Sequence, residues 1–255
     1  MKVLITTVVD AKYMAFAPMF VYCCRQAYPE YDVKIILRDK CLYLLDCETV
    51  LEFQGFPRYL YNTIALRFVV PLENYDGYDY VWITDIDIMM MREDPQLANV
   101  HEKQMVETKM CYSNSLRNKD HYLGSKSLSG LHFATQEWFD RVEPERRRYY
   151  DLLQRGLVGL YREYDGVMLY RMCERSGVRL PGKYKLIKRH GGIHLGSFRL
   201  FDDKEKWADR IPMDFRIGWL RLMEKQAFRD IVERSCRDSY VVAAQVGMLN
   251  EFIRS

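Results

Sequence analysis

Two aspartates, Asp85 and Asp87, stand two residues apart directly after an apolar run. That run, residues 78–84 (YDYVWIT), is rich in aromatic and β-branched side chains, which predicts a buried strand. In extended backbone, side chains two positions apart point the same way, so the two carboxylates are expected side by side. Like charges at close range raise each other's pKa unless a cation lies between them, and a divalent metal ion is the simplest such cation. The pair therefore predicts a metal site, although two solvated aspartates at the start of a loop fit the same residues.

A second unusual stretch, residues 188–199 (KRHGGIHLGSFR), contains two histidines, three glycines and three basic residues. Glycines let the backbone approach a ligand closely, and basic side chains favour an anion. His194, added to the two aspartates, gives a mixed oxygen and nitrogen donor set that suits Mn²⁺ better than Mg²⁺. His190 is the alternative third ligand, and a glycine-rich surface turn is the alternative interpretation of the whole stretch. Three protein ligands would leave coordination positions open for a diphosphate.

The elements that must position these residues alternate between strands and helices. Such alternation predicts a mostly parallel sheet with helices on both faces, and ligands bind beyond the carboxyl ends of its strands. Asp10, at the end of the first strand, is then expected at the same edge as the aspartate pair. Strands are predicted over residues 2–9, 31–38, 78–83 and 129–135, and helices around residues 18–28, 41–53, 58–71, 136–148, 163–177 and 214–255.

Three further polar residues have plain structural interpretations beside functional ones. Asp165 is well placed to cap the helix that starts there. Arg67 lies near the end of the helix over residues 58–71, where a solvated cation is welcome. His132, in an apolar strand, is expected to be a core histidine rather than a ligand.

Taken together, four blocks resemble glycosyltransferase family 8, the metal-dependent, nucleotide-sugar-using family that includes glycogenin and bacterial lipopolysaccharide galactosyl- and glucosyltransferases. The blocks are the opening strand with Asp10 and Tyr13, Arg67-Phe-Val-Val-Pro71 leading to Asp85-Ile-Asp87, Ser129-Gly130-Leu131 with Asp165, and His194 with Gly196-Ser-Phe-Arg199. Lys12 and Ser129 replace the usual asparagines, Arg199 replaces a lysine, the spacing from histidine to glycine is one residue shorter, and a Pro-Trp pair is missing. These departures bear on the identity of the donor sugar.

The resemblance implies a GT-A fold, a Rossmann-like α/β architecture with a mixed, mostly parallel sheet flanked by helices. It implies a catalytic domain over residues 1–202, followed by a helical extension over residues 203–255 that packs on the core or on a partner. It also implies transfer of a sugar from a UDP-sugar to a hydroxyl acceptor, with retention of configuration. The implied metal ligands are Asp85, Asp87 and His194, and the implied catalytic residues are Asp165, Ser129 and Arg67. The implied contacts to the nucleotide sugar are Thr7, Asp10, Tyr13, Arg67, Asp85, Gly130, Gly196 and Arg199.

Composition limits the other function classes. The 38 basic and 35 acidic residues are too balanced to suggest general binding of nucleic acid. Arg146-Arg147-Arg148 is a candidate local basic patch, and a solvated helix face is its alternative. Seven cysteines without a C-x-x-C pair argue against a disulfide framework and against a cysteine zinc site, and favour a reducing compartment.

The expected setting is cytoplasmic, because the cysteines favour a reducing compartment and no apolar stretch is long enough to cross a bilayer. Docking at a membrane surface is compatible with the basic C-terminal helices. The expected partners are the nucleotide-sugar donor, a glycan or other hydroxyl acceptor that could be lipid-linked, and a second copy of the chain. Two alternative functions fit the same residues: a nucleotidyltransferase on a similar sheet, or an inactive relative that binds a nucleotide or a glycan.

Overall fold

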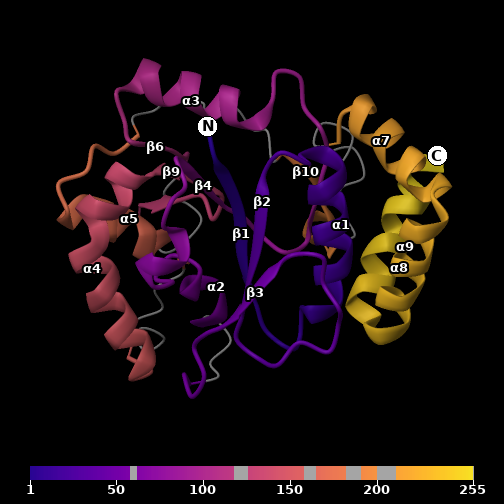
Figure 1. Cartoon of the computed structure of the whole chain (residues 1–255), viewed down its shortest axis with the longest axis horizontal. Coiled ribbons are helices and arrows are strands. Elements are labelled where there is room, and N and C mark those ends of the chain that lie inside the picture. The colour runs from indigo at the N-terminus through magenta and orange to yellow at the C-terminus, as the bar shows by residue number, and fades with distance from the viewer. Residues whose placement is uncertain (58–61, 118–125, 158–164, 182–190, 200–210, 255) are drawn as a thin grey trace.

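A mixed β-sheet forms the centre of the molecule in the computed structural model (Figure 1). The structure describes residues 1–57, 62–117, 126–157, 165–181, 191–199 and 211–254. Among these residues, six strands follow the order β3-β2-β1-β4-β9-β6 across the sheet. The strands are β1 (Val3–Val9), β2 (Asp32–Leu37), β3 (Glu48–Leu51), β4 (Tyr80–Ile83), β6 (Tyr112–Ser113) and β9 (His132–Thr135).

The sheet is mostly parallel, as expected. Strand β1 pairs in parallel with β2 on one side and β4 on the other, and β2 pairs in parallel with β3. Strand β9 runs antiparallel to both β4 and β6. Strands β1 and β2 are apolar on both faces because helices cover both sides of a parallel sheet.

Two apolar cores lie on the two faces of the sheet. Neighbouring residues of β1 belong to different cores, because successive side chains of a strand point to opposite faces: Val3 and Ile5 face one, and Leu4 faces the other. Helix α1 (Ala17–Ala27) covers the first face; α2 (Asn62–Leu66), α4 (Gln136–Gln154) and α5 (Asp165–Arg175) cover the second (Figure 1). The expected α/β class is therefore confirmed.

Two short antiparallel ladders complete the strands of the described residues. Strand β5 (Ile88–Met90) pairs with β10 (Gly192–His194), and β7 (Leu116–Arg117) pairs with β8 (Ser127–Leu128). Helix α3 spans Leu97–Thr108, and three short 3₁₀ helices in the described part of the chain are η1 (Met14–Phe16), η2 (Leu72–Tyr75) and η5 (Leu195–Arg199).

Three helices form the C-terminal region: α7 (Met213–Glu224), α8 (Gln226–Asp238) and α9 (Tyr240–Arg254). Helix α8 packs on α1 (Figure 1). Helix α9 packs on η5, and buried side chains of all three helices join the core on the α1 side of the sheet. The expected helical C-terminal region is confirmed.

Three local predictions are wrong. No helix covers residues 41–53: residues 38–47 cross over without regular structure, and Glu48–Leu51 forms β3, because parallel pairing with β2 requires the chain to return along the sheet. The helix expected over residues 58–71 is α2, which ends at Leu66; residues 58–61 lie outside the description. The predicted strand over residues 129–135 begins only at His132, and the residues before it form a turn.

Other expectations concern the thiols and membrane crossing. All seven cysteines are free thiols in the structure. Among the helices that the structure describes, none has the length and apolar character needed to span a bilayer.

Candidate metal centre

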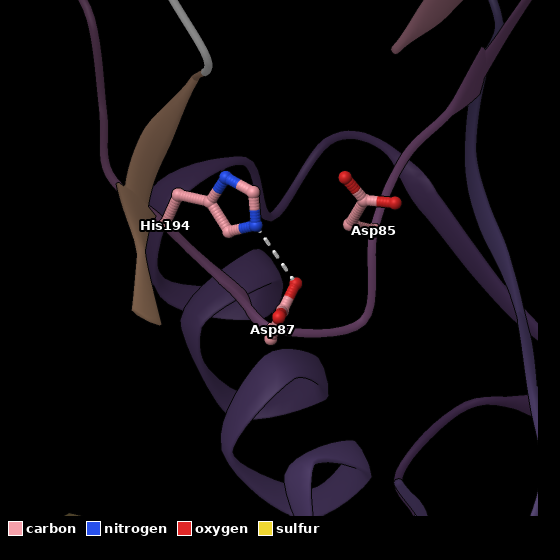
Figure 2. A group of neighbouring side chains, drawn as sticks. All are labelled: Asp85, Asp87 and His194. Atoms are coloured by element: carbon pink, nitrogen blue, oxygen red, sulfur yellow. Dashed lines mark ion pairs between the residues drawn. The ribbon is translucent and has the colours of Figure 1, made fainter. Parts of the chain in front are cut away.

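Asp85 and Asp87 lie in the turn that joins β4 to β5, at the carboxyl end of a central strand. Before the turn, the Thr84 amide donates to the Thr6 carbonyl at 3.0 Å, and within it the Ile88 amide donates to the Asp85 carbonyl at 3.3 Å. The predicted place of the pair is therefore confirmed, but the predicted extended backbone is wrong. A turn, rather than strand alternation, directs both carboxylates to one side (Figure 2).

His194 reaches the aspartates through the backbone pairing of β5 with β10. In this antiparallel ladder His194 lies opposite Ile88, and the next amide, that of Leu195, donates to the Asp87 carbonyl at 2.8 Å. The imidazole Nε2 then lies 3.2 Å from Asp87 Oδ1 (Figure 2). A residue more than a hundred positions later in the chain thus completes the cluster.

The three side chains form a set that fits a metal ion. One ligand atom from each of Asp85, Asp87 and His194 lies within 4.8 Å of the others. Two carboxylates and one imidazole suit Mn²⁺ and similar divalent ions. The side chains of Asp85 and His194 are each 28% exposed, so the cluster is open to a further ligand.

Gly196 provides the space beside the cluster. A Cβ atom on Gly196 would lie 2.4 Å from Asp87 Oδ2 and 2.9 Å from His194 Nε2. Both distances are shorter than a van der Waals contact, so any side chain here would displace a ligand. Gly196 therefore packs directly against Asp87 and His194, and a side chain at this position would require both groups to shift.

Arg67 joins this cluster to a further carboxylate. Its guanidinium pairs through one nitrogen with Asp85 and through the other with Asp165, and its side chain is only 7% exposed. The interpretation of Arg67 as a solvated helix residue is therefore wrong. Burial opposes ionisation of Asp85, but the positive charge of Arg67 outweighs it and lowers the pKa of Asp85 to about 2. Burial likewise opposes the charge on Arg67, and the two carboxylates more than offset it, so the pKa of Arg67 is raised.

Gly130 and Asp165 pack against the same guanidinium. Asp165 lies in the first turn of α5, where a negative charge is also favourable, and its side chain is 18% exposed. A Cβ atom on Gly130 would lie 2.2 Å from Arg67 Nη2 and 3.1 Å from Asp165 Oδ2. Gly130 thus permits a close approach, and the group that approaches is Arg67.

Sequence reasoning missed Asn114, which fixes the turn that carries Gly130. Its Oδ1 accepts the amide of Ser129 at 2.8 Å, and its Nδ2 donates to the Ser129 carbonyl at 3.1 Å. The same Nδ2 lies 2.9 Å from Nδ1 of His132. His132 is fully buried and burial lowers its pKa to about 3, so the prediction of a core histidine is confirmed. An isolated asparagine in a polar segment carries no sequence signal for this role.

Arg146 supports the segment that follows Arg67. Its Nε donates to the Phe68 carbonyl at 3.0 Å, Nη2 donates to the Val70 carbonyl, and Nη1 pairs with Glu143. The neighbouring Arg147 and Arg148 pair with Glu143 and Glu145 at 2.9 and 3.0 Å. The run over residues 146–148 is thus one buried anchor and two paired arginines on the outer face of α4, and not an unpaired basic patch.

The remaining predicted contacts lie at or near the same edge of the sheet. Thr7 lies in β1 and is 2% exposed, and Asp10 follows that strand and accepts the Tyr13 amide at 3.3 Å. Ser129 accepts the Leu131 amide through its hydroxyl at 3.3 Å. Arg199 ends η5, but its side chain lies outside the description, as does the whole of His190.

The architecture is similar to that of several solved glycosyltransferases, at low identity. The apo form of glycosyltransferase GlyE of Streptococcus pneumoniae TIGR4 matches 71% of this chain at 12% identity and a TM-score of 0.42. Core-mannan synthase A of Aspergillus fumigatus, in a Mn/GDP form, matches 68% at 8% identity and a TM-score of 0.42. Galactosyltransferase LgtC, in complex with donor and acceptor sugar analogs, matches 65% at 13% identity and a TM-score of 0.35.

The matches cover 45% of GlyE and 69% of each of the other two chains, so this chain spans less than half the length of GlyE. No protein-family model and no curated protein matches the sequence. The functional argument therefore rests on the residues of the site.

Proposed function

We propose that the protein is a metal-dependent glycosyltransferase that moves a hexose from a UDP-sugar to a hydroxyl acceptor with retention of configuration. The observation that carries the proposal is the convergence of Asp85, Asp87 and His194, whose ligand atoms lie within 4.8 Å of one another. The four sequence blocks that resemble glycosyltransferase family 8 supply this cluster and the Arg67–Asp165 pair next to it.

The chain's own groups have distinct tasks in this proposal. Asp85, Asp87 and His194 hold the ion, and Gly196 leaves space for it. A bound Mn²⁺ or Mg²⁺ would act as a Lewis acid on the diphosphate leaving group. Thr7, Asp10 and Tyr13, in and after β1, are assigned to the nucleotide, and Arg199 is assigned to the diphosphate. A cationic residue in that role would stabilise the negative charge that develops on the leaving group as its bond to the sugar breaks.

The sugar side of the site is assigned to the groups around Arg67. Arg67 holds Asp85 and Asp165 in fixed positions, and Gly130 lets it lie against the turn that Ser129 begins. Asp165 is the carboxylate on the sugar or acceptor side. In a retaining reaction the new bond forms on the face that the leaving group occupied, and a carboxylate on the opposite face can act as nucleophile or stabilise the developing positive charge.

The organisation around the site is part of the same proposal. The catalytic domain covers residues 1–202 and the helical extension residues 203–255; the boundary itself lies among residues outside the description. The acceptor is a glycan or another hydroxyl compound. A lipid-linked acceptor, reached from the cytoplasmic side of a membrane surface, and a homodimer are compatible with the exposed basic residues of α7 and α8.

The test is a thermal-shift screen of nucleotide sugars with and without Mn²⁺, on the wild type and on Asp87→Ala. We expect a UDP-sugar to raise the melting temperature only with Mn²⁺, and Asp87→Ala to abolish that increase because it removes a ligand. Asp140→Ala, which removes an exposed carboxylate from α4, is the matched control and should behave as the wild type. Equal metal-dependent stabilisation in Asp87→Ala would overturn the proposal. In a turnover assay, release of UDP from a UDP-sugar supports sugar transfer, whereas release of pyrophosphate from a nucleoside triphosphate and a sugar phosphate would replace it with nucleotidyl transfer.

A further inference from the structure

The guanidinium of Arg67 is already bound to one of the three metal ligands. It pairs with Asp85 Oδ1 through Nη1, while Asp85 is also part of the Asp85, Asp87 and His194 cluster. A metal ion entering that cluster must therefore share a carboxylate with a fixed positive charge. Two cations on one carboxylate repel each other, and the repulsion is strong where water is partly excluded.

Arg67 is held where it is by the rest of the chain. Its side chain is 7% exposed. Tyr75 Oη donates to the Arg67 carbonyl, and Nε and Nη2 of Arg146 donate to the carbonyls of residues 68 and 70. On its other side, Gly130 packs so closely that a Cβ atom would lie 2.2 Å from Nη2. These contacts hold Arg67 beside Asp85.

Asp165 is the group that moderates the repulsion. Its carboxylate pairs with Nη2 of Arg67 but contributes no atom to the three-residue ligand cluster. It thus balances the arginine charge from the side away from the metal ligands. Without Asp165, the guanidinium charge would bear on Asp85 alone.

We propose, given the metal site of the proposed function, that Arg67 competes with the metal ion for Asp85 and that Asp165 sets the strength of this competition. Arg67 and Asp165 then act in opposite directions on the affinity for the metal alone. Asp165 is a positioning residue in this role, because it acts on the ion through Arg67.

The experiment measures binding of Mn²⁺ alone by isothermal titration calorimetry. We expect Arg67→Gln to lower the Kd for Mn²⁺ by about tenfold, the size expected for removal of a nearby unit charge in a partly screened site. We expect Asp165→Asn to raise the Kd by a similar factor. In the double variant, Asp165→Asn should raise the Kd by less than about threefold, because the residue through which it acts is gone. Arg67→Lys, which keeps the charge, should remain close to the wild type.

The controls separate this inference from the proposed function. Asp140→Asn removes the same charge from the exposed face of α4 and should leave the Kd unchanged. If the wild type binds Mn²⁺ no better than Asp87→Ala, the metal site and the proposed function both fail. If Asp87→Ala loses binding but Arg67→Gln also weakens it, Arg67 organises Asp85 rather than competing for it, and only this inference fails. Arg67→Gln removes two buried ion pairs and could unfold the chain; in that case an unchanged Kd in the near-isosteric Asp165→Asn overturns the inference alone.

Discussion

Arg67 and Arg146 are both buried, both paired with carboxylates and close to each other in the fold, yet their surroundings differ. The side chain of Arg67 is 7% exposed and pairs with Asp85 and Asp165, beside Asp87 and His194. Arg146 is 2% exposed, and its donors are taken by Glu143 and by the carbonyls of Phe68 and Val70.

The difference shows what distinguishes a binding site from a structural ion pair. At Arg146 a cation meets acceptors that have fixed places in the backbone and in one helix, and the fold closes around them. At Arg67 three carboxylates and an imidazole gather, and glycines keep side chains away. Burial of an arginine therefore does not by itself indicate a binding site. A better indication is an excess of anionic side chains beside the arginine, with space kept open next to them.

Among the predicted changes in stability, replacement of Arg146 should have the largest effect. Arg146→Ala should lower the free energy of unfolding by about 3–5 kcal/mol, because it leaves Glu143 and two buried carbonyls without their cation. Arg147→Ala is the matched control: Arg147 pairs with the same Glu143 but its side chain is 78% exposed, so the loss should stay below about 1 kcal/mol. Urea unfolding of both variants measures the difference, and equal losses would mean that the buried guanidinium is not an anchor.

A change at Gly196 tests whether space at the cluster matters. Gly196→Ala should raise the Kd for Mn²⁺ by about 10–100-fold, because the new methyl group would displace the Asp87 carboxylate and the His194 ring. In Gly247→Ala the added methyl group meets no atom within 4 Å, and helix α9 should gain about 0.5–1 kcal/mol with metal binding unchanged. Calorimetry on the pair decides; the idea fails if the two variants bind Mn²⁺ equally well.

The same contrast applies to two histidines, because His132 is buried in the core whereas His194 lies beside the aspartates. The expected effect on stability is smaller than that of Arg146→Ala. Burial lowers the pKa of His132 to about 3, so the folded protein keeps this ring neutral while the unfolded chain takes up a proton near pH 6.5. The unfolded state therefore binds more protons at acidic pH, and stability falls as the pH drops below about 6.5, by about 2 kcal/mol at pH 5 for this one residue. His132→Gln should lose that part of the pH dependence in urea titrations at pH 7 and pH 5. An unchanged slope would show that His132 is protonated in the folded protein.

The parts of the site with a local sequence pattern could be predicted. The apolar run before Asp85 located the pair at a strand end, and glycines around His194 marked the second stretch. The backbone conformation between Asp85 and Asp87 could not be predicted in the same way, because the same amino-acid types occur at strand ends and in tight turns. Residues 41–53 were assigned to a helix because a mixed polar and apolar segment is ambiguous until its partner strand is known.

The supporting residues had no local pattern at all. Asn114 matters because its amide both donates to and accepts from Ser129, and the two residues meet only when β7, β8 and β9 have formed. In the sequence, Arg146 is one member of a run of charged residues. Its role differs from that of Arg147 only because α4 packs against the end of α2. Such roles depend on contacts distant in sequence, so the fold must be known first.

The antiparallel pair of β5 and β10 also has a consequence for the order of assembly. All six strands of the central sheet lie within residues 3–135, so the sheet strands and both aspartates are synthesised well before residue 194. The His194 imidazole reaches the aspartates only when Gly192–His194 pairs with Ile88–Met90. In the proposed metal site, two ligands are therefore synthesised well before the third, and a chain truncated before β10 would lack the imidazole ligand.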